Sequence, residues 1–181
     1  MTCIVGYLDK KKKRVTMGAD SVGSAGHQVV IRKDPKIFRN GDFIIGCTSS
    51  FRMIQLLRFS FKPPEVKCKD IYEYMCTDFV NAVRACFKEG GYLQKDKEGD
   101  EKGGAFLVAY KDRLFEIECD FQVGENLNGL ASVGCGSDFA LGSLFSTEKT
   151  NLSPKDMVLK ALESAAFFSG AVGKPFIVFE T

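Results

Sequence analysis

Short apolar runs dominate the first quarter of the chain, and charged or Asn/Gly-containing turns separate them. Such runs predict β-strands, and the first two lie close enough together to form an antiparallel hairpin. The run Phe43–Cys47 carries no charged residue, which predicts a central strand covered on both faces. The strands predicted here are Thr2–Leu8, Arg14–Asp20, Val29–Arg32, Lys36–Arg39 and Phe43–Cys47.

Helical spacing follows the last of these strands. One helix is predicted after a cap at Ser49 or Ser50, and a longer one runs from a cap at Asp70 to Gly90-Gly91. The Gly/Ser-rich stretch Gly23–Gln28 and the charged stretch Lys95–Gly104 predict loops. The second half predicts strands at Ala105–Tyr110, Leu114–Cys119, Ala131–Gly134 and Pro175–Glu180, and helices at Asp138–Phe145 and from Ser153-Pro154 to about Phe168.

The order of these elements is β-β-β-α-α-β-β-β-α-α-β, with strands grouped into hairpins and helices grouped into pairs. This grouping differs from the strand–helix alternation of a doubly wound sheet. We therefore predict an α+β fold, a four-layer αββα sandwich in which two stacked sheets are covered by helices on both outer sides. No repeat or linker divides the chain, so we expect a single domain over residues 1–181.

Composition narrows the functional classes. The 181 residues are 45% hydrophobic and 27% charged, with a net charge of +2 and both signs interleaved. This balance disfavours a nucleic-acid binder, which would carry a basic excess. No apolar stretch reaches the ~20 residues of a membrane span, and the first residues lack the basic and apolar regions of a signal peptide. We expect a cytoplasmic protein without nucleic-acid or membrane partners.

The cysteines and the single histidine are the residues to examine for a metal site or a nucleophile. Seven cysteines form no C-x-x-C pair, and the one histidine, His27, lies in a predicted surface loop. We interpret the cysteines as reduced thiols that serve as small hydrophobic residues, and we expect no metal ion and no cofactor. With a single histidine, Ser-His-Asp catalysis is disfavoured, so any catalysis needs another base.

Such a base is available at the start of the chain. Initiator methionine is commonly removed when the next residue is as small as threonine, and its removal would expose Thr2. The free α-amine would have a pKa near 7.7–8.0, so a good fraction is neutral at physiological pH. It could accept the proton of its own side-chain hydroxyl as Oγ attacks a carbonyl. Thr2 is therefore a self-contained candidate for nucleophile and base.

Several short motifs resemble a known family when they are taken together with Thr2. They are Thr2–Tyr7, Gly18-Ala19-Asp20-Ser21, Lys36-Ile37-Phe38, Ile44–Cys47, Gly134-Cys135-Gly136 and the late helix ending near Ser169-Gly170. In order and spacing they resemble proteasome β-type subunits, and HslV peptidases above all, across nearly the whole chain. This resemblance implies the N-terminal-nucleophile (Ntn) hydrolase fold.

The resemblance also implies a role for each site residue. Thr2 takes the place of the nucleophile, and Asp20 matches the acid that orients the neighbouring amine and lysine. Lys36 matches the buried lysine that tunes proton transfer. Lys33 is the competing choice, but Lys36 begins a predicted strand as the family's lysine does. Gly46 matches the residue whose backbone N–H stabilises the tetrahedral oxyanion.

The chain departs from the family pattern at three places. Cys135 stands where a serine would donate near the threonine amine, and a thiol is the weaker donor. The end of the last helix retains Ser169, but Ala165–Phe168 contains no carboxylate where the family has an aspartate. The segment Cys47–Ser50 replaces a glycine pair. We treat Cys135 and Ser169 as supporting residues of the site.

The resemblance implies a threonine-type endopeptidase that hydrolyses peptide or protein substrates. It also implies a homo-oligomeric ring, to which an ATPase partner could bind. The departures favour a second hypothesis, a catalytically silent proteasome-like scaffolding subunit. A third keeps the fold and changes the substrate to a small amide.

Overall fold

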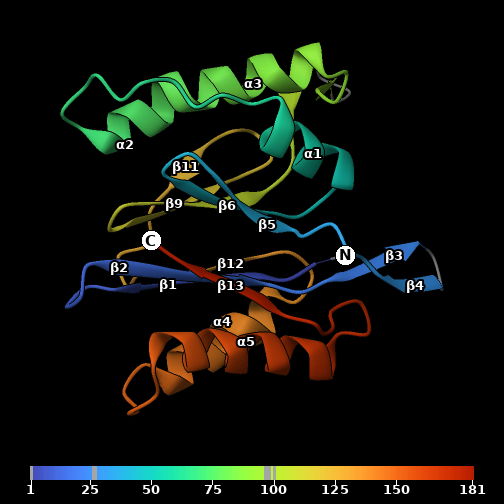
Figure 1. The fold of residues 1–181 in the computed structure, drawn as a ribbon, viewed down its shortest axis with the longest axis vertical. Coiled ribbons are helices and arrows are strands. Elements are labelled where there is room, and N and C mark those ends of the chain that lie inside the picture. The colour runs from blue at the N-terminus through green and yellow to red at the C-terminus, as the bar shows by residue number, and fades with distance from the viewer. Residues whose placement is uncertain (1, 26–27, 96–98, 100) are drawn as a thin grey trace.

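The computed structural model describes residues 2–25, 28–95, 99 and 101–181. The elements stack in four layers (Figure 1). One sheet is covered by α1 (Phe51–Phe59), α2 (Ile71–Tyr74) and α3 (Val80–Glu89), and the other by α4 (Ser137–Thr147) and α5 (Pro154–Phe168). The predicted αββα sandwich is confirmed.

The first sheet contains the start of the chain at its centre. Its strand order is β12 (Leu130–Val133), β1 (Ile4–Asp9), β2 (Arg14–Ala19) and β13 (Ile177–Glu180), with every neighbouring pair antiparallel. Ile4 lies opposite Ala19, and Asp9 lies opposite Arg14. The end of β2 therefore returns to the start of β1, where the candidate nucleophile lies.

The second sheet lies against the first. Its order is β11 (Val123–Gly124), β10 (Arg113–Ile117), β9 (Phe106–Tyr110), β6 (Phe43–Cys47) and β5 (Ile37–Asn40). All five residues of β6 are buried, between β9 and β5, which agrees with the interior strand predicted from its apolar sequence.

Capping residues begin the main helices where the sequence places them. The Ser50 side chain accepts a hydrogen bond from Arg52 N, and that of Ser153 accepts one from Asp156 N. Asp70 caps α2 in the same way. A π-helical segment, η1 (Met75–Phe79), joins α2 directly to α3, so the one long helix predicted here contains a wide turn.

Three buried apolar clusters fill the spaces between the four layers. The largest joins α1 and α3 to the second sheet, and another joins α4 and α5 to the first sheet. The third lies between the two sheets and includes Ile4, Met17, Ile37, Ile44 and Leu107. Because each sheet is covered on both faces, the inner strands hold the site residues in fixed positions.

Two predicted loops are wrong in part. Within Gly23–Gln28, β3 (Val22–Ala25) pairs with β4 (Gln28–Ile31), while His27 lies outside the described residues. Gly and Ser disfavour strands only weakly, and cross-strand pairing overrides that preference. Lys95–Gly104 likewise contains a short pairing of β7 (Gln94–Lys95) with β8 (Glu101–Lys102). Among the described residues, no helix is long and apolar enough to cross a membrane.

Candidate active site

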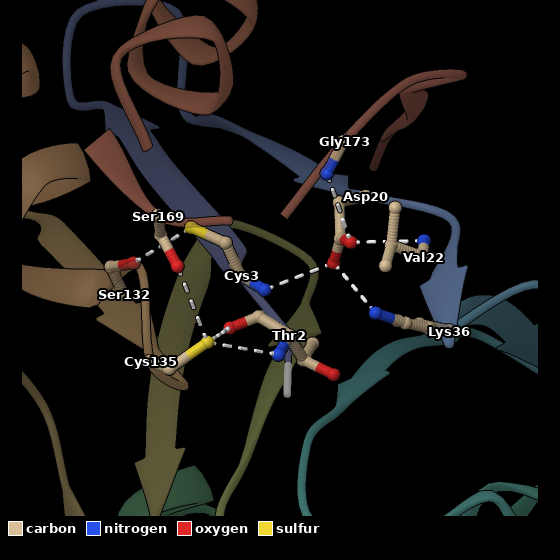
Figure 2. A network of polar contacts seen from close by, with 9 residues as sticks. All are labelled: Thr2, Cys3, Asp20, Val22, Lys36, Ser132, Cys135, Ser169 and Gly173. Atoms are coloured by element: carbon tan, nitrogen blue, oxygen red, sulfur yellow. Dashed lines mark hydrogen bonds and ion pairs between the residues drawn. The ribbon is translucent and has the colours of Figure 1, made fainter. Parts of the chain in front are cut away.

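Thr2 is buried at the entrance to β1, where a glycine-rich turn holds its backbone. Its N–H donates to Cys135 Sγ at 3.3 Å (Figure 2). Its carbonyl accepts from Gly136 N at 3.4 Å. Gly134 has φ +104°, and a Cβ there would lie 2.2 Å from the Thr2 carbonyl oxygen. Only glycine permits this approach, so the turn clamps the backbone of Thr2.

Asp20 and Lys36 form a buried ion pair beside this turn. Asp20 follows β2, Lys36 precedes β5, and Lys36 Nζ lies 2.8 Å from Asp20 Oδ1. The same oxygen accepts from Cys3 N at 3.0 Å, and Oδ2 accepts from Val22 N at 3.0 Å. A further N–H, that of Gly173, donates to Oδ2 at 3.4 Å. Four donors therefore fix the carboxylate, as a buried charge requires.

The ion pair connects directly to the backbone of Thr2. The amide nitrogen of Cys3 is bonded to the Thr2 carbonyl carbon, so Asp20 Oδ1 joins this peptide group to Lys36 (Figure 2). The structure thus brings Thr2, Asp20 and Lys36 together, although they come from three separate segments. Lys33, the competing lysine, is exposed.

Burial sets the electrostatics of the lysine. It lowers the pKa of Lys36 from its ordinary value, because the charged ammonium is poorly solvated. The negative charge of Asp20 and its hydrogen bond act in the opposite direction. The charge state of Lys36 therefore depends on Asp20, its counter-ion at 2.8 Å.

Cys135 and Ser169 lie on the other side of Thr2. Cys135 Sγ is 3.8 Å from Ser169 Oγ and donates to the Thr2 carbonyl at 3.5 Å. Ser169 follows the last residue of α5, so the end of this helix approaches Thr2 as the resemblance implies. No group of three or more His, Cys, Asp or Glu residues suited to a metal ion occurs in the described part of the chain.

Gly46 is the fourth of the five residues of β6 and lies between Ile37 on β5 and Leu107 on β9. A Cβ at this position would be 2.5 Å from Ile4 Cγ2, so the glycine allows β6 to approach β1 closely. The next residue, Cys47, donates from its N–H to the Lys36 carbonyl at 2.9 Å. Gly46 therefore has a packing reason for being glycine, and its part in an oxyanion hole stays a prediction.

The loop after β6 lies beside the candidate site, and the sequence motifs predict no role for it. Ser49 has φ +60°, a backbone conformation that non-glycine residues rarely adopt. Thr48 lies beside the Gly134 turn, since its Cγ2 would be 3.3 Å from a Cβ added at Gly134. The sequence signal for this loop is the glycine pair that Cys47–Ser50 replaces, because glycine is the usual residue at a φ like that of Ser49. Gly173, which binds Asp20, carried no comparable signal.

A four-layer αββα sandwich with a threonine leading into an inner strand defines the class of fold, that of the Ntn hydrolases. Comparison with known proteins agrees, although no family model matches the chain. The chain is 23% identical over 161 residues to the ATP-dependent protease subunit HslV of Caldicellulosiruptor saccharolyticus. The aligned residues make up 87% of this chain and 86% of that HslV.

Solved structures extend this likeness to the whole fold. BPH from Thiobacillus denitrificans, in complex with epoxomicin, matches with a TM-score of 0.83 and 21% identity over 99% of this chain and 98% of BPH. HslV from Trypanosoma brucei matches with a TM-score of 0.70 and 18% identity over 99% and 98%. The chain therefore has the HslV-like Ntn-hydrolase fold.

Proposed function

We propose that the chain is a threonine-type endopeptidase whose nucleophile is Thr2, exposed by removal of Met1. The observation that carries this proposal is the convergence on Thr2 of a buried carboxylate–ammonium pair and the Gly134–Gly136 turn. The likeness to HslV supports it at the level of the threonine-peptidase class.

In the proposed reaction, the α-amine of Thr2 takes the proton of Oγ as this oxygen attacks the substrate carbonyl. The amide carbonyl becomes a tetrahedral oxyanion, which needs an N–H donor. The Gly46 N–H, the donor predicted from the family resemblance, belongs to a strand that is paired on both sides. The protonated amine then gives its proton to the leaving nitrogen, and the C–N bond breaks to leave an ester on Oγ. Water, deprotonated by the same amine, hydrolyses this ester and regenerates Thr2.

Asp20 and Lys36 act on the amine through electrostatics and position. Asp20 holds the peptide group after Thr2 by accepting from Cys3 N at 3.0 Å. The positive charge of Lys36 disfavours a second positive charge nearby, which keeps the amine neutral at lower pH and so available as a base. Cys135 Sγ, 3.3 Å from Thr2 N, orients the nitrogen.

The setting proposed is a homo-oligomeric ring in a reducing cytoplasm, with peptides or unfolded proteins as substrates and an ATPase as a partner that would deliver them. The seven cysteines are all free thiols, which suits such a compartment. The proposal of an ATPase partner rests on the name of the HslV relative, an ATP-dependent protease subunit.

A direct test combines N-terminal mass spectrometry with peptide hydrolysis. We expect the mature protein to begin at Thr2, to hydrolyse fluorogenic peptides, and to lose this activity in Thr2→Ala. Thr2→Ser keeps a hydroxyl and should retain part of the activity. Thr150→Ala removes the hydroxyl of an exposed threonine outside the site, and as the matched control it should leave the activity unchanged. A mature protein that retains Met1 would exclude the mechanism, because an amide nitrogen is not basic.

The second candidate, a catalytically silent scaffolding subunit, is favoured by one observation. The Thr2 N–H donates to a thiol, and the end of α5 places Ser169 beside that thiol without a carboxylate among Ala165–Phe168. It predicts that the wild type and Thr2→Ala are equally inactive yet assemble equally well. Labelling by epoxomicin, which is bound in the BPH structure, would separate the two candidates, since a silent subunit should not react.

A further inference from the structure

The β3–β4 hairpin is an apolar ribbon with little cover. Its exposed side chains are Val29, Val30 and Ile31, whose exposed fractions are 56%, 59% and 55%. Consecutive strand residues point to opposite faces, so both faces of β4 present apolar surface. In Figure 1 the hairpin extends beyond the end of the sandwich. A two-stranded ribbon is marginal by itself in water, and this strand carries no charge or proline to protect it.

A second apolar surface lies at the opposite end of the two sheets. Leu127, between β11 and β12, is 94% exposed, and Phe145 on α4 is 71% exposed. They border a hollow of about 730 Å³, which we call the Leu127 hollow. Its walls include Lys10, Leu127, Leu130, Leu141, Phe145 and Glu148. A smaller hollow of about 240 Å³, with Leu8 and Leu114, adjoins Leu127 on its other side.

Each of the two surfaces offers one exposed charge that is opposite in sign to that of the other. Lys33, which is exposed, follows the hairpin two residues after Ile31. Glu148, also exposed, lies at the rim of the Leu127 hollow. The cation at that rim, Lys10, is directed to the Leu127 carbonyl, to which its Nζ donates at 2.7 Å. The rim therefore offers an anion to a partner whose projecting ribbon ends in a cation.

The two surfaces are too far apart to cover each other within one molecule. The hairpin continues from β2 at the Ile4 end of β1, whereas the Leu127 hollow adjoins the Leu8 end of the same strand. A projection at one end and a matching hollow at the other define a heterologous contact between copies, which closes into a ring or extends as a filament.

We propose that the β3–β4 hairpin of one copy seats in the Leu127 hollow of the next copy. This inference deepens the ring proposed above by naming the two faces that join. Exposed apolar patches of this kind mark interaction sites in proteins of this size. Seating the hairpin buries Val29, Val30 and Ile31 and brings Lys33 towards Glu148 of the receiving copy.

The contact would also act on the catalytic pair. Val22, the first residue of the hairpin, donates from its N–H to Asp20 Oδ2 at 3.0 Å. At its other end, Arg32 N donates to the Ser21 carbonyl at 2.9 Å. A seated hairpin would therefore hold the segment that carries Asp20, so assembly and activity are coupled. This last step rests on the proposed peptidase function, whereas the contact itself does not.

A complementation experiment tests the contact. Val30→Asp disables the hairpin and Leu127→Asp disables the hollow, while Phe59→Asp alters an exposed apolar residue outside both surfaces. Light scattering should find an oligomer for the wild type and Phe59→Asp and monomers for the other two variants. An equimolar mixture of the two should form a 1:1 heterodimer, because one intact hairpin and one intact hollow remain. Circular dichroism should show that all variants fold.

Three outcomes would overturn the proposal: a wild type that stays monomeric at tens of micromolar, a Leu127→Asp variant that assembles like the wild type, or a mixture that stays monomeric. The second outcome would indicate edge-to-edge pairing of two hairpins. Peptide hydrolysis is measured separately, in Thr2→Ala as well. If every protein is inactive but the mixing pattern holds, the peptidase proposal fails and the assembly contact stands.

Discussion

Lys36 Nζ lies 2.8 Å from Asp20 Oδ1, and the exposed fractions of the two side chains are only 1% and 0%. Burial of two charges is costly, and their attraction offsets this cost only while both are present. Asp20 Oδ1 also accepts from the Cys3 N–H, so the geometry of the pair is tied to the backbone of Thr2, the proposed nucleophile. Stability and proposed catalysis therefore depend on the same contact in different ways.

Removing one partner of this pair should damage both properties. Asp20→Asn leaves the Lys36 ammonium buried without its counter-ion, and we expect the free energy of unfolding to fall by about 3–5 kcal/mol. Peptide hydrolysis should fall by about 10²–10⁴-fold, because the α-amine, the proposed general base, loses the carboxylate that positions the peptide group beside it. Urea unfolding and steady-state kinetics measure the two effects.

The double variant Asp20→Asn/Lys36→Met separates the two effects. Removing both charges should restore a large part of the stability, since no unpaired charge remains buried. Activity should stay low, because the electrostatic effect on the amine is gone. Recovery of activity together with stability would mean that the pair is only structural.

Cys135 offers a chemical test of the site. Its side chain is exposed and 3.3 Å from Thr2 N, whereas burial raises the pKa of Cys3 to about 12 and also raises that of Cys47. Iodoacetamide should therefore alkylate Cys135 and block hydrolysis, while the two buried thiols stay protected.

Cys135→Ser should make hydrolysis resistant to iodoacetamide, and it should raise kcat because a hydroxyl is the better hydrogen-bonding partner for the amine. The exposed Cys76 and Cys119 remain in this variant and serve as an internal control for labelling. Equal inactivation of Cys135→Ser and wild type would place the sensitive thiol elsewhere.

Much of the fold could be predicted because its signals are local. Phe43–Cys47 reads as a strand from its own apolar residues, and β6 has these same bounds. Ser153 and Pro154 mark a helix start by capping and by a fixed φ, and α5 begins at Pro154. Such signals need no knowledge of the rest of the chain.

The completed site could not be predicted in the same way. The Gly173 N–H reaches Asp20 across 153 positions of sequence, and the Thr2 N–H reaches Cys135 across 133. These contacts depend on how the sheets and helices stack, which no local pattern encodes. The motif resemblance pointed to Asp20 and Lys36, whereas β3 was missed because Gly23 and Ser24 favour a loop by composition.

Gly134 should tolerate no side chain. Its φ of +104° strains any L-residue, and an added Cβ would overlap the Thr2 carbonyl oxygen at 2.2 Å. We expect Gly134→Ala to lower the free energy of unfolding by about 2–5 kcal/mol and to displace Thr2, the proposed nucleophile. Gly142→Ala is the matched control, because open space surrounds this position on α4. It should stabilise the protein by about 0.5–1 kcal/mol, and thermal unfolding measures both changes.

Glu116 on β10 should make stability depend on pH. Burial, together with a hydrogen bond and the negative charge from Glu118, raises the pKa of Glu116 to about 7. Between its ordinary value of 4.5 and about 7, the folded state holds a proton that the unfolded state has lost. Stability should therefore be full below pH 4.5 for this group and decline as pH rises towards 7.

Glu116→Gln replaces the protonated acid with a neutral amide of the same shape, so this decline should disappear. Because Glu116 is only half-buried, we expect a gain of about 1–2 kcal/mol over the wild type at pH 8 and little difference at pH 5. Urea unfolding at the two pH values measures it. Asp112→Asn, a carboxylate in the turn between β9 and β10, should leave the pH dependence unchanged. An identical slope in Glu116→Gln and wild type would assign the pH dependence to other groups.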